Sequence, residues 1–269
     1  MVVAGAVLIG AFVVMAIVAP WVAPHDPRAI TGDVLEQPSD DHLFGTNESG
    51  QDIFSQILHG ARPSLIIAVE AATLVVIIGG FLGVASGLLG GLVDMLIMRA
   101  VDVMLALPGL PLILLIVALA GPGRTAVVGV IALFGWPRLA RVVRSQALSL
   151  RQRGFIAAAR GFGGGRLYVL RRHLLPAVAP LLVTGFIYVA EIAILIEAGL
   201  AFLGLGDPTQ VTWGSVLNRA LNYPALYFTN LWTRWVLPAG MAITLAVLGF
   251  TFLGVGLEPR FNPAGRDRE

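Results

Sequence analysis

A loop between two apolar stretches carries the residues best suited to contact another protein. It reads Gly-Phe-Ile-Ala-Ala-Ala-Arg-Gly-Phe-Gly-Gly-Gly-Arg over residues 154–166 and continues to Pro176. This pattern predicts a short helix, a break at glycines 163–165, and a second helix that ends at Pro176. Such a loop offers a contact surface and charge to a partner protein.

Two features of the first helix favour docking. One side has little bulk, so another protein can approach its backbone closely; it is formed by Ala157, Ala158 and Ala159. The charge around it comes from Arg160, Arg171 and Arg172. An ordinary basic loop that only sets membrane topology would have the same composition, so composition alone leaves both interpretations open.

Three glutamates lie within apolar stretches, where a charged side chain costs about 2.5–3.5 kcal/mol on insertion scales. We therefore expect each to face a cavity or a protein partner. Glu191 is the deepest and is the first candidate for the translocation pathway or a dimer seam. Glu70, about 9 Å along a helix from Ser64, is near the outer interface and is the second candidate. Glu197 is expected to be structural, at the outer end of its span.

The chain lacks the residues that several other chemistries need. It has no cysteine, which excludes disulfides, thiolate metal sites and cysteine nucleophiles. All 18 basic residues are arginines, whereas a phosphate-binding P-loop needs a lysine. The sequence has no Gly-x-Ser-x-Gly or His-Glu-x-x-His motif. We therefore expect no catalytic residue, no enzymatic activity and no cofactor bound by this chain.

The histidines show no metal-ligand spacing. The four are His25, His42, His59 and His173, and no two are separated as in His-x-x-x-His. We predict no metal site. The first three are expected in solvent outside the membrane, and the fourth in a structural role.

Composition identifies the class of protein that must position these residues. Hydrophobic residues make up 57% of the 269 and charged residues 13%, whereas soluble domains have about a quarter charged residues. Mean hydropathy is +0.85. These values predict an all-α polytopic membrane protein and exclude a soluble enzyme. Nucleic acid is not an expected partner, because the net charge is only +2 and the arginines cluster in one loop.

Six apolar stretches approach the roughly 20 residues that a spanning helix needs. They are Val2–Val22 and residues 65–92, 103–120, 125–143, 177–203 and 235–257. The first lacks the basic start of a cleaved signal peptide and has a longer apolar run, so we interpret it as a retained span. Pro108 and Pro111 should kink the third. Trp232 and Trp235 resemble interfacial anchors before the sixth.

Charge asymmetry sets the expected orientation. Residues 138–173 hold nine arginines and no acid, whereas residues 24–59 hold seven acids and one arginine. The basic loop is therefore expected in the cytoplasm, together with both termini. The predicted divisions are a first transmembrane helix (1–23), an extracytoplasmic loop (24–63), a five-helix core (64–258) containing the cytoplasmic coupling loop (144–175), and a cytoplasmic tail (259–269).

The spacing within the basic loop resembles a known family pattern. Permeases of ABC importers carry a cytoplasmic loop with Glu-Ala-Ala, three residues, a glycine, nine residues and a hydrophobic-Pro end. Here the triplet starts at Ala157, the glycine is Gly163 and the end is His173-Leu174-Leu175-Pro176. Ala157 departs from the pattern because the family usually has glutamate there, which leaves the charged contact to Arg160 or the flanking arginines.

Further blocks resemble the dipeptide, oligopeptide and nickel branch of these permeases, in its second subunit type. They are residues 44–65, 98–108, 196–206 and 213–217. The first of them begins Phe-Gly-Thr-Asn-Glu-Ser-Gly, and the third reads Ile-Glu-Ala-Gly-Leu-Ala-Phe-Leu-Gly-Leu-Gly. The resemblance covers about residues 20–252, while the Gly-Val-Gly-Leu-Glu-Pro ending departs from it.

The resemblance implies a type I ABC-importer permease fold in a bacterial cytoplasmic membrane. It implies a heterodimer with a sister permease, two cytoplasmic ATPase subunits that bind ATP and Mg²⁺, and an extracytoplasmic substrate-binding protein. Substrates in this branch are short peptides, nickel complexes and haem, and the residues do not choose among them. The ATPase-coupling residues would be Ala157, Ala158, Ala159, Arg160 and Gly163.

A different class of protein stays open as the alternative. An ATP-independent secondary transporter or channel would also span the membrane several times. Such proteins often show internal repeats and ionisable relays at the midplane. This chain has no clear repeat and few acids in its spans, which favours the importer permease.

Overall fold

The computed structural model describes residues 1–261, and apart from two isolated β-bridges its regular elements in that range are helices. Within this range the structure does not describe the side chains of residues 155, 157, 158, 160, 166 and 259–261. Five helices are long and apolar enough to cross a membrane, and a bent helix pair raises the number to six if it counts as one span. The all-α membrane fold is confirmed.

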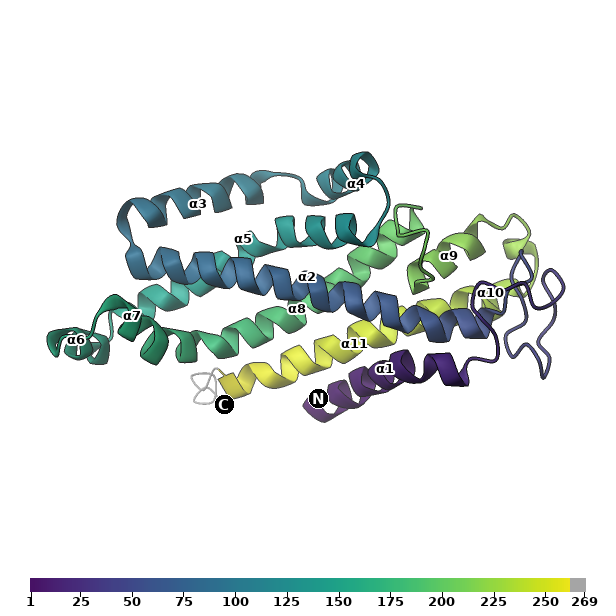
Figure 1. The fold of residues 1–269 in the computed structure, drawn as a ribbon, viewed down its shortest axis with the longest axis horizontal. Coiled ribbons are helices and arrows are strands. Elements are labelled where there is room, and N and C mark those ends of the chain that lie inside the picture. The colour runs from purple at the N-terminus through teal and green to yellow at the C-terminus, as the bar shows by residue number, and fades with distance from the viewer. Residues whose placement is uncertain (262–269) are drawn as a thin grey trace.

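Long helices run along the length of the molecule and are joined at both ends by short elements (Figure 1). The long helices are α1 (Val2–Val22), α2 (Ile53–Leu89), α5 (Arg124–Arg151), α8 (Leu175–Phe202) and α11 (Val236–Phe261). One end carries α6 (Gly154–Gly161), α7 (Arg166–Val169) and the π-helix η1 (Leu170–Leu174). The other carries the loop before α2, α9 (Trp213–Asn222), the 3-10 helix η2 (Leu226–Phe228) and α10 (Leu231–Arg234).

Helix α2 differs most from its predicted bounds, since it begins at Ile53 rather than at residue 65. Its first turns are too polar for a hydropathy criterion, but Asp52 caps them: the carboxylate accepts a hydrogen bond from the Ser55 N–H at 2.7 Å. Such a cap satisfies one of the free amides at a helix start. Part of the predicted outside loop is therefore helix.

The predicted third span is a broken pair. Helices α3 (Gly91–Ala106) and α4 (Gly109–Ala120) meet at an angle of 87°. The break lies at Leu107 and Pro108, where a proline disfavours a helical conformation of the residue before it. The prediction placed a kink here but missed that the helical chain starts at Gly91. Gly90 and Gly91 both have positive φ, which lets the chain turn from α2 into α3.

Glycines on α2 bring that helix into backbone contact with α5. A Cβ at Gly79 would lie 2.9 Å from the carbonyl oxygen of Trp136, and one at Gly83 would lie 2.6 Å from that of Ala140. Small residues permit this close approach of membrane helices. Gly79 and Gly83 are therefore part of the packing surface between α2 and α5.

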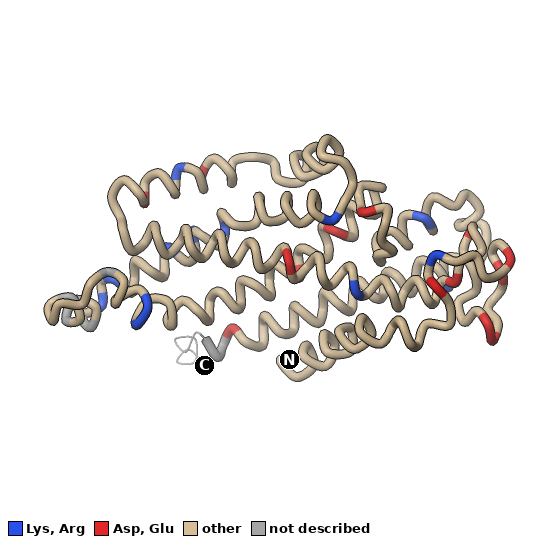
Figure 2. Tube along the Cα trace, in the orientation of Figure 1, with Lys and Arg blue, Asp and Glu red and all other residues tan. Residues whose placement is uncertain are grey.

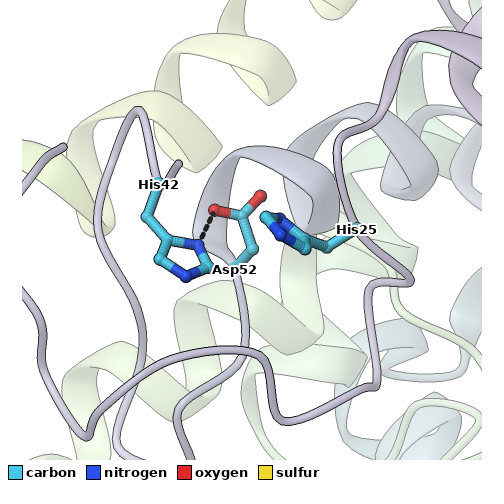
Figure 3. A group of neighbouring side chains, drawn as sticks. All are labelled: His25, His42 and Asp52. Atoms are coloured by element: carbon cyan, nitrogen blue, oxygen red, sulfur yellow. Dashed lines mark hydrogen bonds and ion pairs between the residues drawn. The ribbon is translucent and has the colours of Figure 1, made fainter. Parts of the chain in front are cut away.

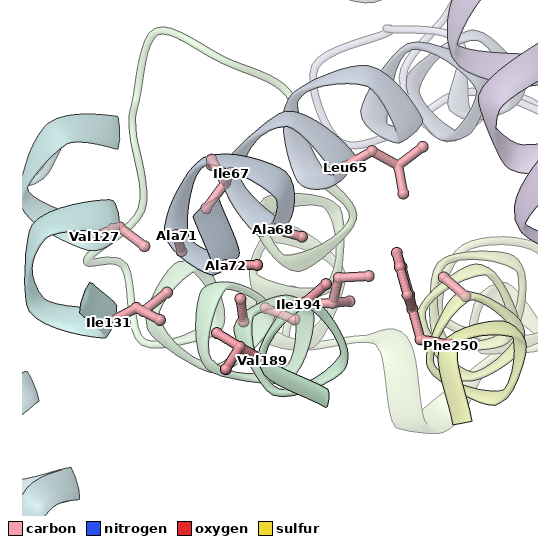
Figure 4. Packing of buried hydrophobic residues seen from close by; sticks show 14 of the residues in the cluster. Leu65, Ile67, Ala68, Ala71, Ala72, Val127, Ile131, Val189, Ile194 and Phe250 are labelled. Atoms are coloured by element: carbon pink, nitrogen blue, oxygen red, sulfur yellow. The ribbon is translucent and has the colours of Figure 1, made fainter. Parts of the chain in front are cut away.

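The central core lies where α2, α5, α8 and α11 face one another (Figure 4). Small side chains such as Ala68 and Ala72 on α2 meet larger ones, including Ile194 on α8 and Phe250 on α11. Trp235 is fully buried in this core, so the prediction that it is an interfacial anchor is wrong. Trp232 is 49% exposed.

The predicted tail from residue 259 falls partly on helix. Helix α11 continues to Phe261, and residues 262–269 lie outside the described part of the chain.

Candidate functional site: the α6–η1 tip and the α5/α8/α11 cavity

The predicted docking loop forms the tip of the molecule, which we define as residues 154–174 (Figure 1). It contains two helical pieces separated by a turn at residues 162–165, as the glycine break predicts. Ala157, Ala158, Ala159 and Arg160 all lie on α6. The side chains of Ala157, Ala158 and Arg160 lie outside the described residues, so their contacts stay predictions.

A small hydrophobic cluster holds the tip in place. It contains Ala147 from the end of α5, Ile156 from α6, Val169 from α7 and Leu174 from η1. Ile156 is 1% exposed and Val169 is fully buried. Helix α6 is thus packed onto the bundle rather than tethered by its ends alone.

Gly163 ends α6 in a conformation that favours glycine. Its φ is +83°, and a Cβ there would meet no atom within 4 Å. The next residue, Gly164, donates its N–H to the carbonyl oxygen of Ala159 at 2.9 Å. This arrangement satisfies a free carbonyl at the end of the helix. Gly163 therefore serves the backbone of the turn, and any larger residue there is strained by conformation rather than by lack of space.

An aromatic side chain that the sequence reasoning missed lies at the turn. Phe162 is 93% exposed, and Leu167 and Tyr168 beside it are 58% and 52% exposed. The apolar–glycine pattern gave no sign of this, because only the fold shows which side of the turn faces outwards. The described residues of the tip include Arg171 and Arg172 on η1, and none of them is an acid (Figure 2).

Glu191 lies on the wall of a cavity of about 860 Å³ between α5, α8 and α11. The wall is mostly apolar but includes polar side chains from all three helices, among them Arg138, Tyr188 and Thr251. Arg138 donates a hydrogen bond to the Tyr188 hydroxyl at 3.4 Å, which joins α5 and α8. A largely apolar wall with a few polar groups is typical of a small-molecule site.

Glu70 occupies a different place. Its carboxylate is paired with Arg124 at the start of α5, with the Arg124 Nε donating to Oε2 at 2.8 Å. Both side chains are more than a third exposed, and among the described residues the cavity wall does not include Glu70. The geometry gives Glu70 a pairing role, and its part in a pathway stays a prediction.

Glu197 is buried at the seam between α8 and α2, as its predicted structural role requires. It is 2% exposed and accepts a hydrogen bond from the Ser64 hydroxyl at 3.3 Å. Nearby, Trp213 of α9 is fully buried and donates its indole N–H to the Ile57 carbonyl of α2 at 3.0 Å. These two bonds join α2 to α8 and to α9 at the end of the bundle that carries α9.

The three histidines predicted to lie outside the membrane are not all in solvent, and that prediction is wrong for His42. His42 is 3% exposed and lies beside His25 and Asp52 (Figure 3). Their positions along the chain share no helical or strand period, so sequence spacing gave no signal of this cluster. His59 is separate and bonds to the carbonyl of Ser55.

Comparison with known families decides between the classes of membrane protein. Residues 76–264, about 70% of the chain, match the family described as binding-protein-dependent transport system inner membrane component. The chain belongs to this permease family. Residues 1–43 also match the N-terminal transmembrane domain of oligopeptide transport permease C. The resemblance drawn from the loop motifs is confirmed.

Individual relatives align with nearly the whole permease. A putative peptide permease protein of Brucella suis is 38% identical over 96% of this chain and 85% of its own length. The probable D,D-dipeptide transport system permease protein of Escherichia coli is 36% identical over 97% of this chain and 87% of its own length. The chain is thus a multi-pass inner-membrane component of a transport system.

Proposed function

We propose that this chain is the permease subunit of an ATP-driven importer of short peptides or a related small solute. Support for the substrate class comes from the relatives, whose names specify peptide and D,D-dipeptide transport. Alternating access would carry the substrate across the membrane. The acid-rich loop would face outside and the arginine-rich tip, with both termini, would face the cytoplasm.

The observation that carries the coupling proposal is the exposed Phe162 on a tip that is otherwise anchored by its own cluster. A large aromatic exposed beside other apolar side chains is typical of a protein contact. We assign α6 to a groove of the ATPase, with Ala157, Ala158 and Ala159 allowing close approach, Arg160 supplying charge and Gly163 ending the helix.

The anchoring also meets an energetic requirement. Moving a two-state pore from 1:99 to 99:1 needs about 5.5 kcal/mol of differential binding. A loop held only at its ends would move without moving the bundle. The difference in binding free energy would then not reach the pore. Ile156 and Val169, both buried, connect the docking surface to α5 and η1, so the tip can act as a rigid lever.

The proposal includes four kinds of partner. A sister permease would complete the cavity beside Glu191, and two cytoplasmic ATPase subunits would bind ATP and Mg²⁺. An extracytoplasmic binding protein would deliver substrate to the opposite end of the molecule. Within the cavity, Glu191 is the proposed pathway residue. Glu70 would influence the translocation pathway only indirectly, by holding Arg124 at the start of α5.

Cross-linking from a single introduced cysteine tests the docking. The native sequence has no cysteine, so Phe162→Cys gives one reactive site that can carry a photo-activated maleimide. In native membranes we expect it to capture an ATPase subunit. Val34→Cys, on the other end and 64% exposed, is the matched control and should capture none.

Two results would contradict the proposal. Equal capture of ATPase from both positions would remove the docking role of the tip. Transport that continues without ATPase subunits and follows an ion gradient would favour the alternative, an ATP-independent secondary transporter or channel.

A further inference from the structure

Three side chains outside the membrane bundle form a compact group of metal-binding type. One ring nitrogen each of His25 and His42 and a carboxylate oxygen of Asp52 all lie within 4.8 Å of one another (Figure 3). The two imidazole rings are 4.7 Å apart between centroids. The group is separate from the tip and from the Glu191 cavity.

We propose that His25, His42 and Asp52 bind a divalent transition-metal ion of the zinc type. Two imidazole nitrogens and one carboxylate oxygen are ligands that Zn²⁺ takes, whereas Ca²⁺ and Mg²⁺ prefer oxygen ligands alone. Three protein ligands leave a fourth tetrahedral position for water.

The distances suit such an ion after a small contraction. Tetrahedral zinc, with bonds of about 2.0–2.2 Å, holds its ligand atoms about 3.4 Å apart. His42 Nδ1 and Asp52 Oδ1 are already 3.1 Å apart. The ligand nitrogen of His25 would then have to move by roughly 1.5–2 Å to reach this distance from both other atoms. That residue is half-buried in an irregular segment, so a side-chain rotation supplies the movement.

A second layer of contacts already orients two of the ligands. The other oxygen of Asp52, Oδ2, accepts the N–H of Ser55 at 2.7 Å. Oδ1 is hydrogen-bonded to His42 Nδ1, so the ion would take the place of the hydrogen between these two atoms. The other ring nitrogen of His42, Nε2, faces Glu36 Oε2 at 3.8 Å. Carboxylates that accept a hydrogen bond from the second ring nitrogen fix metal-binding histidines, and Glu36 would need to approach by a few tenths of an ångström to make this bond.

His25 shows why a purely structural role does not account for the group. The His42–Asp52 pair can be explained by the cap on α2, but His25 Nδ1 is buried with no hydrogen-bond partner among the described residues. A buried polar atom without a partner costs free energy. The backbone N–H of His25 donates to Ser55 Oγ at 3.2 Å, which holds the residue over the cap. A bound metal ion would supply the partner that the buried His25 side chain lacks.

The ion would join three separate segments of the outside face. His25 follows the end of α1, His42 lies in the loop, and Asp52 starts α2. Metal binding would therefore stabilise this face of the chain against opening, independently of what the permease transports.

Metal retention by the full-length chain in lipid nanodiscs tests the proposal. After EDTA treatment, desalting, loading with Zn²⁺ and removal of excess ion, we expect one equivalent of zinc by elemental analysis and a higher melting temperature. Mg²⁺ should cause no such shift. Co²⁺ should give the intense visible absorption of a tetrahedral site.

The informative variant is His25→Phe, which keeps an aromatic ring against His42 and removes the nitrogens. Without metal it should melt as the wild type does, and its zinc affinity should fall by about 100-fold or more. His25→Gln provides the same test if the phenylalanine disturbs folding. His59→Gln is the matched control, because His59 is outside the group, and it should bind like the wild type.

Either of two results would overturn the proposal. One is a wild type that retains no zinc and shows no zinc-dependent stabilisation. The other is zinc binding by both His25 variants as tight as that of His59→Gln. Neither readout depends on ATPase partners or on transport, so failure here is distinct from failure of the proposed transport function.

Discussion

Glu197 on α8 and Ser64 on α2 are 133 residues apart in the sequence and joined by a buried 3.3 Å hydrogen bond. The contact lies near the end of α8 and in the first half of α2, and Thr212, which precedes the buried Trp213, also bonds to the Glu197 side chain. It is a buried polar contact within the bundle, and it holds this part of α8 in a fixed position relative to α2.

Removing one partner of this bond should destabilise the protein. We expect Glu197→Leu to lower stability by about 1–3 kcal/mol, because the Ser64 hydroxyl is left buried without its acceptor. Ser64→Ala should cost less, since Glu197 remains but loses one donor. Thermal unfolding in detergent measures both variants. If the double variant is as destabilised as the sum of the singles, the two residues do not interact.

The contact between α2 and α5 should be sensitive to a single methyl group. A Cβ at Gly83 would lie 2.6 Å from the Ala140 carbonyl oxygen, so Gly83→Ala must push the helices apart at a cost of about 1–3 kcal/mol. Gly129→Ala on α5 is the control, because nothing lies within 4 Å of its Cβ position. That change should be neutral or stabilising by up to about 1 kcal/mol. Equal melting temperatures for both variants would contradict this packing argument.

The turn after α6 should tolerate substitutions according to backbone conformation rather than size. Gly163→Ala places a Cβ at φ +83°, which costs about 1–2 kcal/mol, and it should uncouple ATP hydrolysis from transport. Gly163→Asn should retain more activity, since asparagine enters this conformation more readily. Gly161→Ala, within α6 and in open space, is the control. Both activities are measured in proteoliposomes, and full coupling in Gly163→Ala would reject the rigid-tip interpretation.

The two candidate pathway glutamates should respond differently to the same change. Glu191→Gln alters the cavity wall, and we expect transport to fall about tenfold, equivalent to about 1.4 kcal/mol, with assembly intact. Glu70→Gln, which is outside that wall, should leave transport within about twofold of the wild type because its exposed ion pair contributes only about 0–1 kcal/mol. The measurement is the transport rate of each variant, normalised to the amount of assembled complex. A larger loss in Glu70→Gln than in Glu191→Gln would indicate that Glu70, rather than Glu191, lies on the pathway.

The Glu70–Arg124 pair should tolerate reversal. Glu70→Arg alone places two arginines together, while the double change Glu70→Arg and Arg124→Glu restores an opposite pair. We expect the double variant to recover the stability lost in the single one, as measured by thermal unfolding. No recovery would show that neighbouring groups, rather than the pair, fix these side chains.

The bounds of a helix are predicted well from the sequence where an apolar run lies between polar loops. The bounds of α1, α8 and α11 agree with the predicted spans to within a few residues. The kink at Pro108 was predicted, but the starts of α2 and α3 were missed. The first turns of α2 are polar, and the first turns of α3 carry Asp94 and Arg99, so both segments lie outside an apolar window.

For the candidate sites, too, the features set by local sequence were predicted and those set by long-range packing were not. Gly163 and the helix of alanines could be predicted because they depend on local conformation and spacing. The exposure of Phe162, the pairing of Glu70 with Arg124 and the meeting of His25 with His42 depend on how distant segments pack. No local pattern encodes those contacts in a single sequence.

The packing of α1 against α11 has a consequence for biosynthesis. A Cβ on Gly5 would lie 2.6 Å from the Leu253 backbone nitrogen, and one on Gly256 would lie 2.7 Å from that of Val2, so the first helix fits closely against the last. At about 5–20 residues per second, the ribosome needs roughly 10–50 s after α1 to produce α11. During that interval α1 has to remain in the bilayer with its final partner absent, shielded by lipid, α2 or an insertion factor.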